Sequence, residues 1–378
     1  MPSLRDALEA ALVEDPDDLA THRAYADYLQ EQGDPRGEFI QVQLALEDTE
    51  RTPEERQELE RRERELLDAH GRKWLGVLAD ELQLRPVDDP WGVFEVTEPP
   101  YEIRFTRGWL NGIVLRNNPF GYGPRLSRLL PQASESRLLR ELVLATVEKL
   151  IPSPLLANLR IFQLGETVDD YQDASNNVWC EDVPDFVATL PHLEILRLFA
   201  HGYDPAKLFA LPNLTNLRVL QVYHLLALHP LEVLAENGAL GQLTHLLLHP
   251  HASLDPLIDL ASVRALLHSP HLRNLTHLQI RCSDLGDVGC TEIVTSGILK
   301  RLNVLDLRHG EITDAGARIL ADCPDLRRLE RLDIARNGLT QTGIDALHRV
   351  LSEKLWADDQ QSAGELTQRQ YLYEGVFE

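Results

Sequence analysis

The sequence is poor in cysteine and has no long apolar run. Its 378 residues include four cysteines, Cys180, Cys282, Cys290 and Cys323, and no two of them form a CxxC pair. Scattered cysteines are typical of reduced thiols in a cytoplasmic protein and do not predict a disulfide framework or a zinc module. No apolar segment approaches the roughly 18 residues that a membrane span needs, and the polar first ten residues predict no signal peptide.

Catalytic motifs are also missing. The sequence has no GxSxG turn, HExxH helix, P-loop or GxGxxG turn. His249, His251 and Asp255 form one cluster of possible metal ligands, and acidic residues around Asp169 and Asp182 form another. The first is typical of a proline-containing loop, and the second lacks the glycine and terminal glutamate of an EF-hand. We therefore expect no enzyme activity, no metal and no cofactor.

Positive charge is scarce. The formal net charge is −23, and only five of the 37 basic residues are lysines. Such a chain repels nucleic acid and anionic membranes unless a local patch reverses the sign. A nucleic-acid or membrane partner is therefore not expected.

Leucines recur with a fixed spacing instead. The template L-x-x-L-x-L begins at Leu275, Leu302 and Leu329, which are 27 residues apart, and a glycine follows each at the same offset. Weaker copies begin at Leu110, Leu139, Leu159, Leu193, Leu217 and Leu243. In such a core the side chains alternate along a strand, so the leucines point inward. No single repeat buries its own apolar face, so the repeats must stack.

The segments LDLRHGEITDAGARILAD and LDIARNGLTQTGIDALHRV resemble ribonuclease-inhibitor-like leucine-rich repeats, and the resemblance covers roughly residues 105–355. It implies an α/β solenoid with a parallel sheet inside and helices outside. We assign 110–355 to this solenoid, 86–109 to a junction that caps its first repeat, and 356–378 to a C-terminal cap or mobile acidic tail.

Residues 1–85 are predicted to form a separate all-helical domain. Ser3, Asp34-Pro35 and Thr52-Pro53-Glu54-Glu55 are helix-start signals, and Gly33 ends a helix. The segment 22–46, with Ala26, Leu29, Gly33, Asp34, Gly37 and Phe39, resembles the N-terminal repeat-companion domain of bacterial repeat proteins. That resemblance implies the architecture and adds little about mechanism.

The outward side of the expected sheet offers the candidate site. Counting the third, fifth, seventh and eighth positions of nine repeats gives six arginines, five histidines and four acidic residues. The candidate partner-binding residues are Arg197, Phe199, Tyr223, His245, His277, Arg281, Arg308, His309, Arg331 and Arg336. An alternative is that Arg281 and Arg308 only pair with Asp306 and Asp333 on neighbouring strands.

The sequence thus predicts a cytoplasmic, non-catalytic scaffold that presents this face to a protein partner with an acidic or polar surface. An alternative is binding of nucleic acid or a phosphate ligand by the same arginines, which the overall acidity disfavours. A more remote alternative is a metal-dependent hydrolase that uses the histidines.

Overall fold

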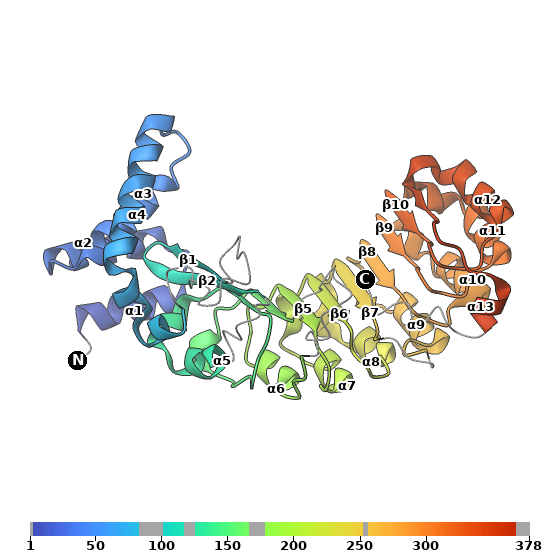
Figure 1. Cartoon of the computed structure of the whole chain (residues 1–378), viewed down its shortest axis with the longest axis horizontal. Helices are drawn as coiled ribbons and strands as arrows, with labels where there is room; N and C mark the ends of the chain where they lie inside the picture. Colours follow the sequence, from blue (N-terminus) through green and yellow to red (C-terminus); the bar gives the residue numbers. More distant parts are fainter. Residues whose placement is uncertain (1–2, 83–100, 117–124, 166–177, 252–255, 368–378) are drawn as a thin grey trace, which may run out of the picture. The chain divides into compact units, whose positions relative to one another are not determined.

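The chain folds into two compact units, 1–161 and 162–378. The computed structural model describes residues 3–82, 101–116, 125–165, 178–251 and 256–367 (Figure 1). Four helices open the first unit, followed by strands and short helices. Its elements are α1 (Leu4–Glu14), α2 (Leu19–Glu31), α3 (Pro35–Leu46), α4 (Pro53–Leu75), β1 (Tyr101–Thr106), β2 (Trp109–Leu115), α5 (Leu126–Leu129) and β3 (Glu141–Leu144).

The helix-start signals at Ser3, Asp34 and Thr52 and the stop at Gly33 are confirmed, whereas α2 begins at Leu19, two residues before the predicted Thr21, and α4 continues to Leu75. Ser3 and Thr52 each accept from the backbone N–H three residues later, completing the capping boxes of α1 and α4. Gly33 follows α2 with a φ of 68°, a left-handed conformation that a glycine adopts without strain. Asp34 caps α3, and Pro35 is its first residue.

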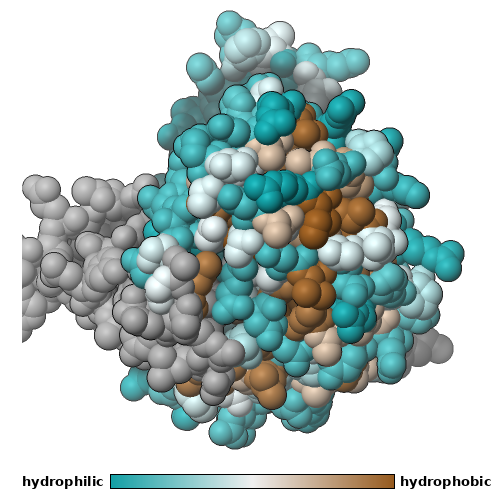
Figure 2. Space-filling model, turned by 90° about the vertical axis from the view of Figure 1, so that its right-hand side faces the viewer, coloured by the Kyte–Doolittle hydropathy of each residue, from teal (hydrophilic) through white to brown (hydrophobic). Residues whose placement is uncertain are grey.

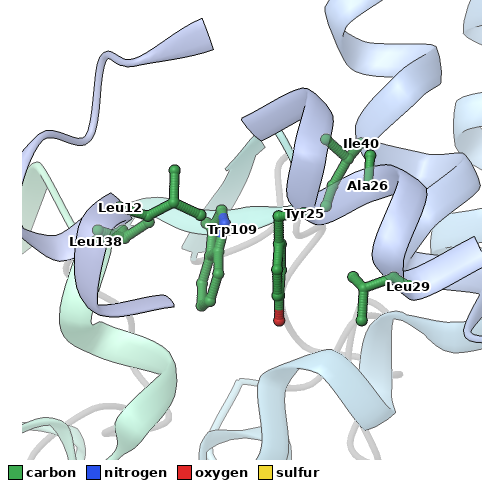
Figure 3. Packing of buried hydrophobic residues seen from close by; sticks show 7 residues of the cluster. All are labelled: Leu12, Tyr25, Ala26, Leu29, Ile40, Trp109 and Leu138. Carbon is green, nitrogen blue, oxygen red and sulfur yellow. The ribbon is translucent and has the colours of Figure 1, made fainter. Parts of the chain in front are cut away.

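The first unit buries an aromatic core between its helices and strands. Trp109 of β2 stacks against Tyr25 of α2, with ring centroids 5.6 Å apart. Figure 3 shows Trp109 between Tyr25 on one side and Leu12 and Leu138 on the other. The helices therefore pack directly on the first repeat strand.

The junction ahead of the first repeat contains β1, which pairs with β2 in antiparallel fashion. It occupies the edge of β2 that the parallel partner β3 does not use. The expected edge-sealing role thus falls to residues 101–106, while residues 86–100 of the predicted junction lie outside the described part of the chain.

The second unit repeats a strand and a helix along the chain. Strands β5 to β10 lie on one side, with helices on the other (Figure 1). Its elements, after β4 (Ile161–Leu164) at the unit boundary, are α6 (Val183–Val187), β5 (Ile195–Phe199), α7 (Pro205–Phe209), β6 (Val219–Tyr223), α8 (Leu231–Glu236), β7 (His245–His249), α9 (Leu260–Leu267), β8 (His277–Ile280), α10 (Gly286–Ser296), β9 (Val304–Asp306), α11 (Asp314–Asp322), β10 (Arg331–Asp333), α12 (Gln341–Leu351), β11 (Leu355–Trp356) and α13 (Ala363–Thr367).

The leucine template predicted the core correctly. Leu278, Leu305 and Leu332 are at most 1% exposed and pair with one another in adjacent parallel strands. The template positions of the other six repeats are buried as well. Each layer of the core therefore takes one side chain from each repeat, as stacking requires.

The segment after the last predicted repeat adds one more strand. β11 pairs in parallel with β10, so that Leu355 continues the row of Leu332. Residues 357–367 follow β11 and end in α13, while 368–378 lie outside the described residues.

Candidate binding surface on the sheet of the second unit

The third position of each repeat forms one continuous row on the outward side of the sheet. Parallel pairing brings these positions into register from β5 to β10. All are half-buried, whereas the leucines beside them are fully buried. The members of this outward row are Ile195, Val219, His245, His277, Val304 and Arg331.

Two histidines of the outward row stack on each other. The imidazoles of His245 and His277 lie 3.9 Å apart at an interplanar angle of 15°. The Thr244 hydroxyl lies within hydrogen-bond distance of both the Arg218 carbonyl, at 3.0 Å, and His245 Nδ1, at 2.8 Å. Thr276 repeats the arrangement beside His277. Each threonine hydroxyl therefore fixes the orientation of the neighbouring imidazole through its Nδ1.

The predicted arginine pair lies within an ion-pair network. Arg281 Nη2 is 2.9 Å from Asp306 Oδ2, and its Nε donates to the same oxygen. Arg308 Nε lies 3.6 Å from Asp306 and 3.4 Å from Asp333. The alternative in which these arginines pair across strands is thus the arrangement that the structure contains.

This network is nearly closed to solvent. Asp306 is 1% exposed, Asp333 2% and Arg281 8%. Burial raises the pKa of Asp306, and the Arg281 guanidinium opposes that rise. Removing one partner would leave a buried charge uncompensated. Arg281 and Arg308 therefore contribute to holding β8, β9 and β10 together.

The eighth position of two repeats, at Cys282 and His309, is buried, which corrects the prediction that His309 is accessible. The backbone turns to a positive φ there, 53° at Cys282 and 54° at His309. The left-handed turn follows directly after the strand, and both residues are buried. Burial, with Arg336 and Arg281 nearby, lowers the pKa of His309 to about 3.

An aromatic cluster lies at the ends of β5, β6 and β7. The rings of Phe199 and Tyr223 meet edge to face at 5.4 Å, and Tyr223 lies 5.2 Å from His249. Tyr223 accepts a hydrogen bond of 2.6 Å from Gln279. Phe199 is buried, which corrects its assignment to an accessible surface, whereas Tyr223 stays half-buried.

The remaining predicted arginines are accessible. Arg331 lies over the ring of Trp356, 4.9 Å from its centroid, and Trp356 is half exposed. Arg336 lies 3.8 Å from Asp359, and Arg197 is half-buried on β5. The 27-residue spacing does not predict Trp356, because Leu355 continues the row of Leu332 only 23 residues later.

Sequence reasoning also missed a buried amide that organises the last turns. Asn337 accepts from the backbone N–H groups of Gly310 and Ile312 and donates to the Leu307 carbonyl. Its side chain satisfies backbone groups of two repeats at once, which buried polar groups require. Asn337 lies three residues beyond Ile334. The equivalent positions of the two preceding repeats are Ser283 and Gly310, so no repeated asparagine marked this site in the sequence.

The possible metal clusters find no support in the described structure. Across the described ranges, no three His, Cys, Asp or Glu side chains are placed to hold a metal ion. Asp255, Asp169, Asp170 and Asp173 lie outside those ranges. All four cysteines are buried, and none of them forms a disulfide.

Figure 2 shows the end of the second unit that carries α11 and α12, where small hydrophobic groups lie among hydrophilic residues. Among the described helices, none is long and apolar enough to cross a membrane.

A family model of leucine-rich repeats matches residues 271–294 and 301–321. Among solved structures, a Bacteroides fragilis protein is similar at 22% identity and TM-score 0.44, over 56% of this chain and 59% of the other. An internalin from Listeria monocytogenes is 17% identical, with TM-score 0.37, over 62% of this chain and 70% of that one.

The leucine-rich-repeat ectodomain of the Arabidopsis receptor kinase HAESA, solved with a peptide hormone, is 17% identical. Its TM-score is 0.35 over 68% of this chain and 44% of the other. A comparison with curated proteins finds no match.

Proposed function

We propose that this chain, a leucine-rich-repeat protein, is a non-catalytic scaffold that binds a protein partner on the outward side of β5–β10. The observation that carries the proposal is the outward row, whose side chains stay half-exposed in register across six strands. A flat row of strands spaced about 4.8 Å apart suits an extended macromolecular contact better than a small ligand.

The accessible part of the predicted site supports a partner with acidic or polar groups. His245, His277 and Arg331 lie in the outward row, and Arg197, Tyr223 and Arg336 lie beside it. Arginine and aromatic side chains are the residue types that most often anchor protein interfaces. Arg281 and Arg308 act on this surface indirectly, because their guanidinium groups are engaged by Asp306 and Asp333.

We further propose that the protein works in the cytoplasm and that residues 1–85 are a bacterial repeat-companion domain. Four buried cysteines that form no disulfide are compatible with a reducing compartment. The capped helices around Gly33 and Asp34 are compatible with the resemblance of segment 22–46.

A capture experiment in the source cell's lysate tests the proposal. The parent chain and a His245→Ala, His277→Ala, Arg331→Ala variant are compared with an Arg318→Ala control, which changes an exposed helix residue. We expect the same protein partner on parent and control, and at least about tenfold weaker binding to the triple variant.

Nuclease treatment and a salt series accompany the capture. Retention that vanishes with nuclease, or falls steeply with salt concentration, would instead indicate nucleic acid and would overturn the proposal of a protein partner. Equal binding by the triple variant and the control would remove this surface from the account.

A further inference from the structure

A pocket of about 410 Å³ opens in the first unit. Five elements converge on it: α1, the start of α3, the end of α4, β2 and the turn 134–138. Its volume lies in the range of small-ligand sites. The side chains that define its chemistry are Glu9, Arg36, Lys73, Trp74, Trp109 and Arg137.

Arg36 is held rigidly in this pocket. Its guanidinium lies over the Trp109 ring, 4.4 Å from the centroid, and its Nε donates to the Gly108 carbonyl at 2.8 Å. These two contacts fix the plane of the group and leave the Nη1 and Nη2 end open. Within the described residues Arg36 makes no ion pair, although burial lowers its pKa.

Arg137 is anchored next to it in a similar way. Its Nε donates to the Ser134 carbonyl at 2.6 Å, and it lies 5.6 Å from the Trp109 centroid. Unlike Arg36, Arg137 has a carboxylate partner, with Nη1 at 2.5 Å from Glu9.

The pocket's carboxylates are mostly occupied elsewhere. Glu9 also accepts from Arg5 and from the Tyr25 hydroxyl, so three donors share it. Asp34 accepts from the Arg36 backbone N–H as the cap of α3. Arg36 and Lys73 are therefore left as cations without a carboxylate within ion-pair distance among the described residues.

We propose that this pocket binds a small oxyanion, a phosphate or carboxylate group, between the open end of the Arg36 guanidinium and the Lys73 ammonium. The two Nη groups of an arginine match two oxygens of such an anion, and a guanidinium already fixed in place loses little entropy on binding.

Isothermal titration of the full chain with inorganic phosphate, and separately with acetate, at constant ionic strength tests the proposal. We expect saturable binding of at least one anion in the millimolar range or tighter. Preference for phosphate identifies a phosphate-bearing ligand, and preference for acetate a carboxylate. Absence of binding for both anions at about 20 mM would overturn the proposal.

Three variants locate the site. Arg36→Lys keeps the positive charge but loses the planar pair of Nη donors, and we expect about tenfold weaker anion binding. Lys73→Met changes an exposed residue and should weaken binding severalfold, while Lys149→Met, an equally exposed lysine outside the pocket, should not.

The third variant removes an opposing charge. Glu135 lines the pocket, and Glu135→Gln keeps its shape while deleting a negative charge, so binding should tighten severalfold. A purely structural role for these residues gives no such gain. Anion binding that is unchanged in Lys73→Met and Glu135→Gln would place the anion elsewhere and contradict the proposal.

Discussion

Asn337 is the residue on which the last repeats depend most. It is fully buried, and its amide pairs with the Gly310 and Ile312 N–H groups and the Leu307 carbonyl. Asn337→Ala leaves these backbone groups unpaired away from water, so we expect a loss of about 3 kcal/mol or more in the free energy of unfolding. Denaturant unfolding measures it.

Asn303→Ala is the matched control, because the Asn303 side chain is half-buried and makes no hydrogen bond among the described residues. It should change the free energy of unfolding by less than about 0.5 kcal/mol. Similar losses from the two variants would contradict the role given to Asn337.

The buried histidines make stability depend on pH. Burial lowers the pKa of His201, His224 and His229 to about 4 and that of His309 to about 3. These rings stay neutral in the folded chain, but the unfolded chain takes up protons below about 6.5. The stability they contribute is therefore present above pH 6.5 and is lost as pH falls towards 4.

His309→Gln isolates one of these groups. The raised pKa of Asp306 acts with the opposite sign, since its neutral form favours the folded state at low pH. The contribution of Asp306 is common to the variant and the parent, so it cancels in the difference between their stabilities. Between pH 6.5 and 5, urea unfolding of the parent should weaken more steeply than that of the variant, by up to about 1.4 kcal/mol per pH unit. Parallel pH profiles would refute this.

The residue types alone predicted that arginines gather on the outward face. They did not predict which of these arginines are accessible to a partner and which are buried in ion pairs. The template placed Arg281, Arg308 and Asp306 on neighbouring strands, and their pairing follows from that placement. Whether a charge is buried depends on the side chains around it, which a single-repeat template does not contain. Replacing Arg281 would thus leave Asp306 buried and unpaired, so the fold would suffer as well as any binding.

At the scale of the elements, α11 and α12 each begin with hydrogen bonds to an aspartate of the preceding repeat. Asp287 of α10 accepts from the Thr313 and Gly316 N–H groups at the start of α11, and Asp314 does the same for Thr340 and Gly343 of α12. A Cβ at Gly316 would lie 2.5 Å from Asp287 Oδ1. The recurring glycine therefore makes room for the carboxylate of the preceding repeat.

Gly316→Ala should push this carboxylate away and weaken its three hydrogen bonds. We expect a loss of about 1–3 kcal/mol in the free energy of unfolding. Gly241→Ala is the control, because no atom lies within 4 Å of its added Cβ. A Gly316→Ala variant as stable as the Gly241→Ala variant would contradict this explanation of the glycine.

The burial of the strand residues could be predicted from the sequence, because side chains along a strand alternate with a period of two. Leu275, Leu278 and Ile280 are buried as the template requires. The eighth position was not predictable in this way, since alternation ends where the strand ends. At His309 and Cys282 the left-handed backbone turn replaces it.

At the scale of the first unit, the N-terminal helices cover the first repeat strand. Removal of residues 1–82 would expose Trp109 and leave Arg107 without Glu47 and Arg140 without Asp17. We expect the melting temperature of the remaining chain to fall by roughly 10 °C. An unchanged melting temperature would show that the helices fold as an independent module.

At the scale of the whole molecule, the proposed binding surface is the outward row and not the helices of the second unit. Val304 is the fifth of the six positions of that row, between His277 and Arg331, and Arg318 is exposed on α11. A photo-crosslinking amino acid placed at each position in turn reports which side touches the partner.

The most direct measurement is the crosslinking yield to a protein in the source cell's lysate after irradiation. The account predicts a defined crosslinked species from position 304 and none above background from position 318. Crosslinking from position 318 alone, or from neither position while the partner is still captured, would contradict the claim that the outward row is the binding surface.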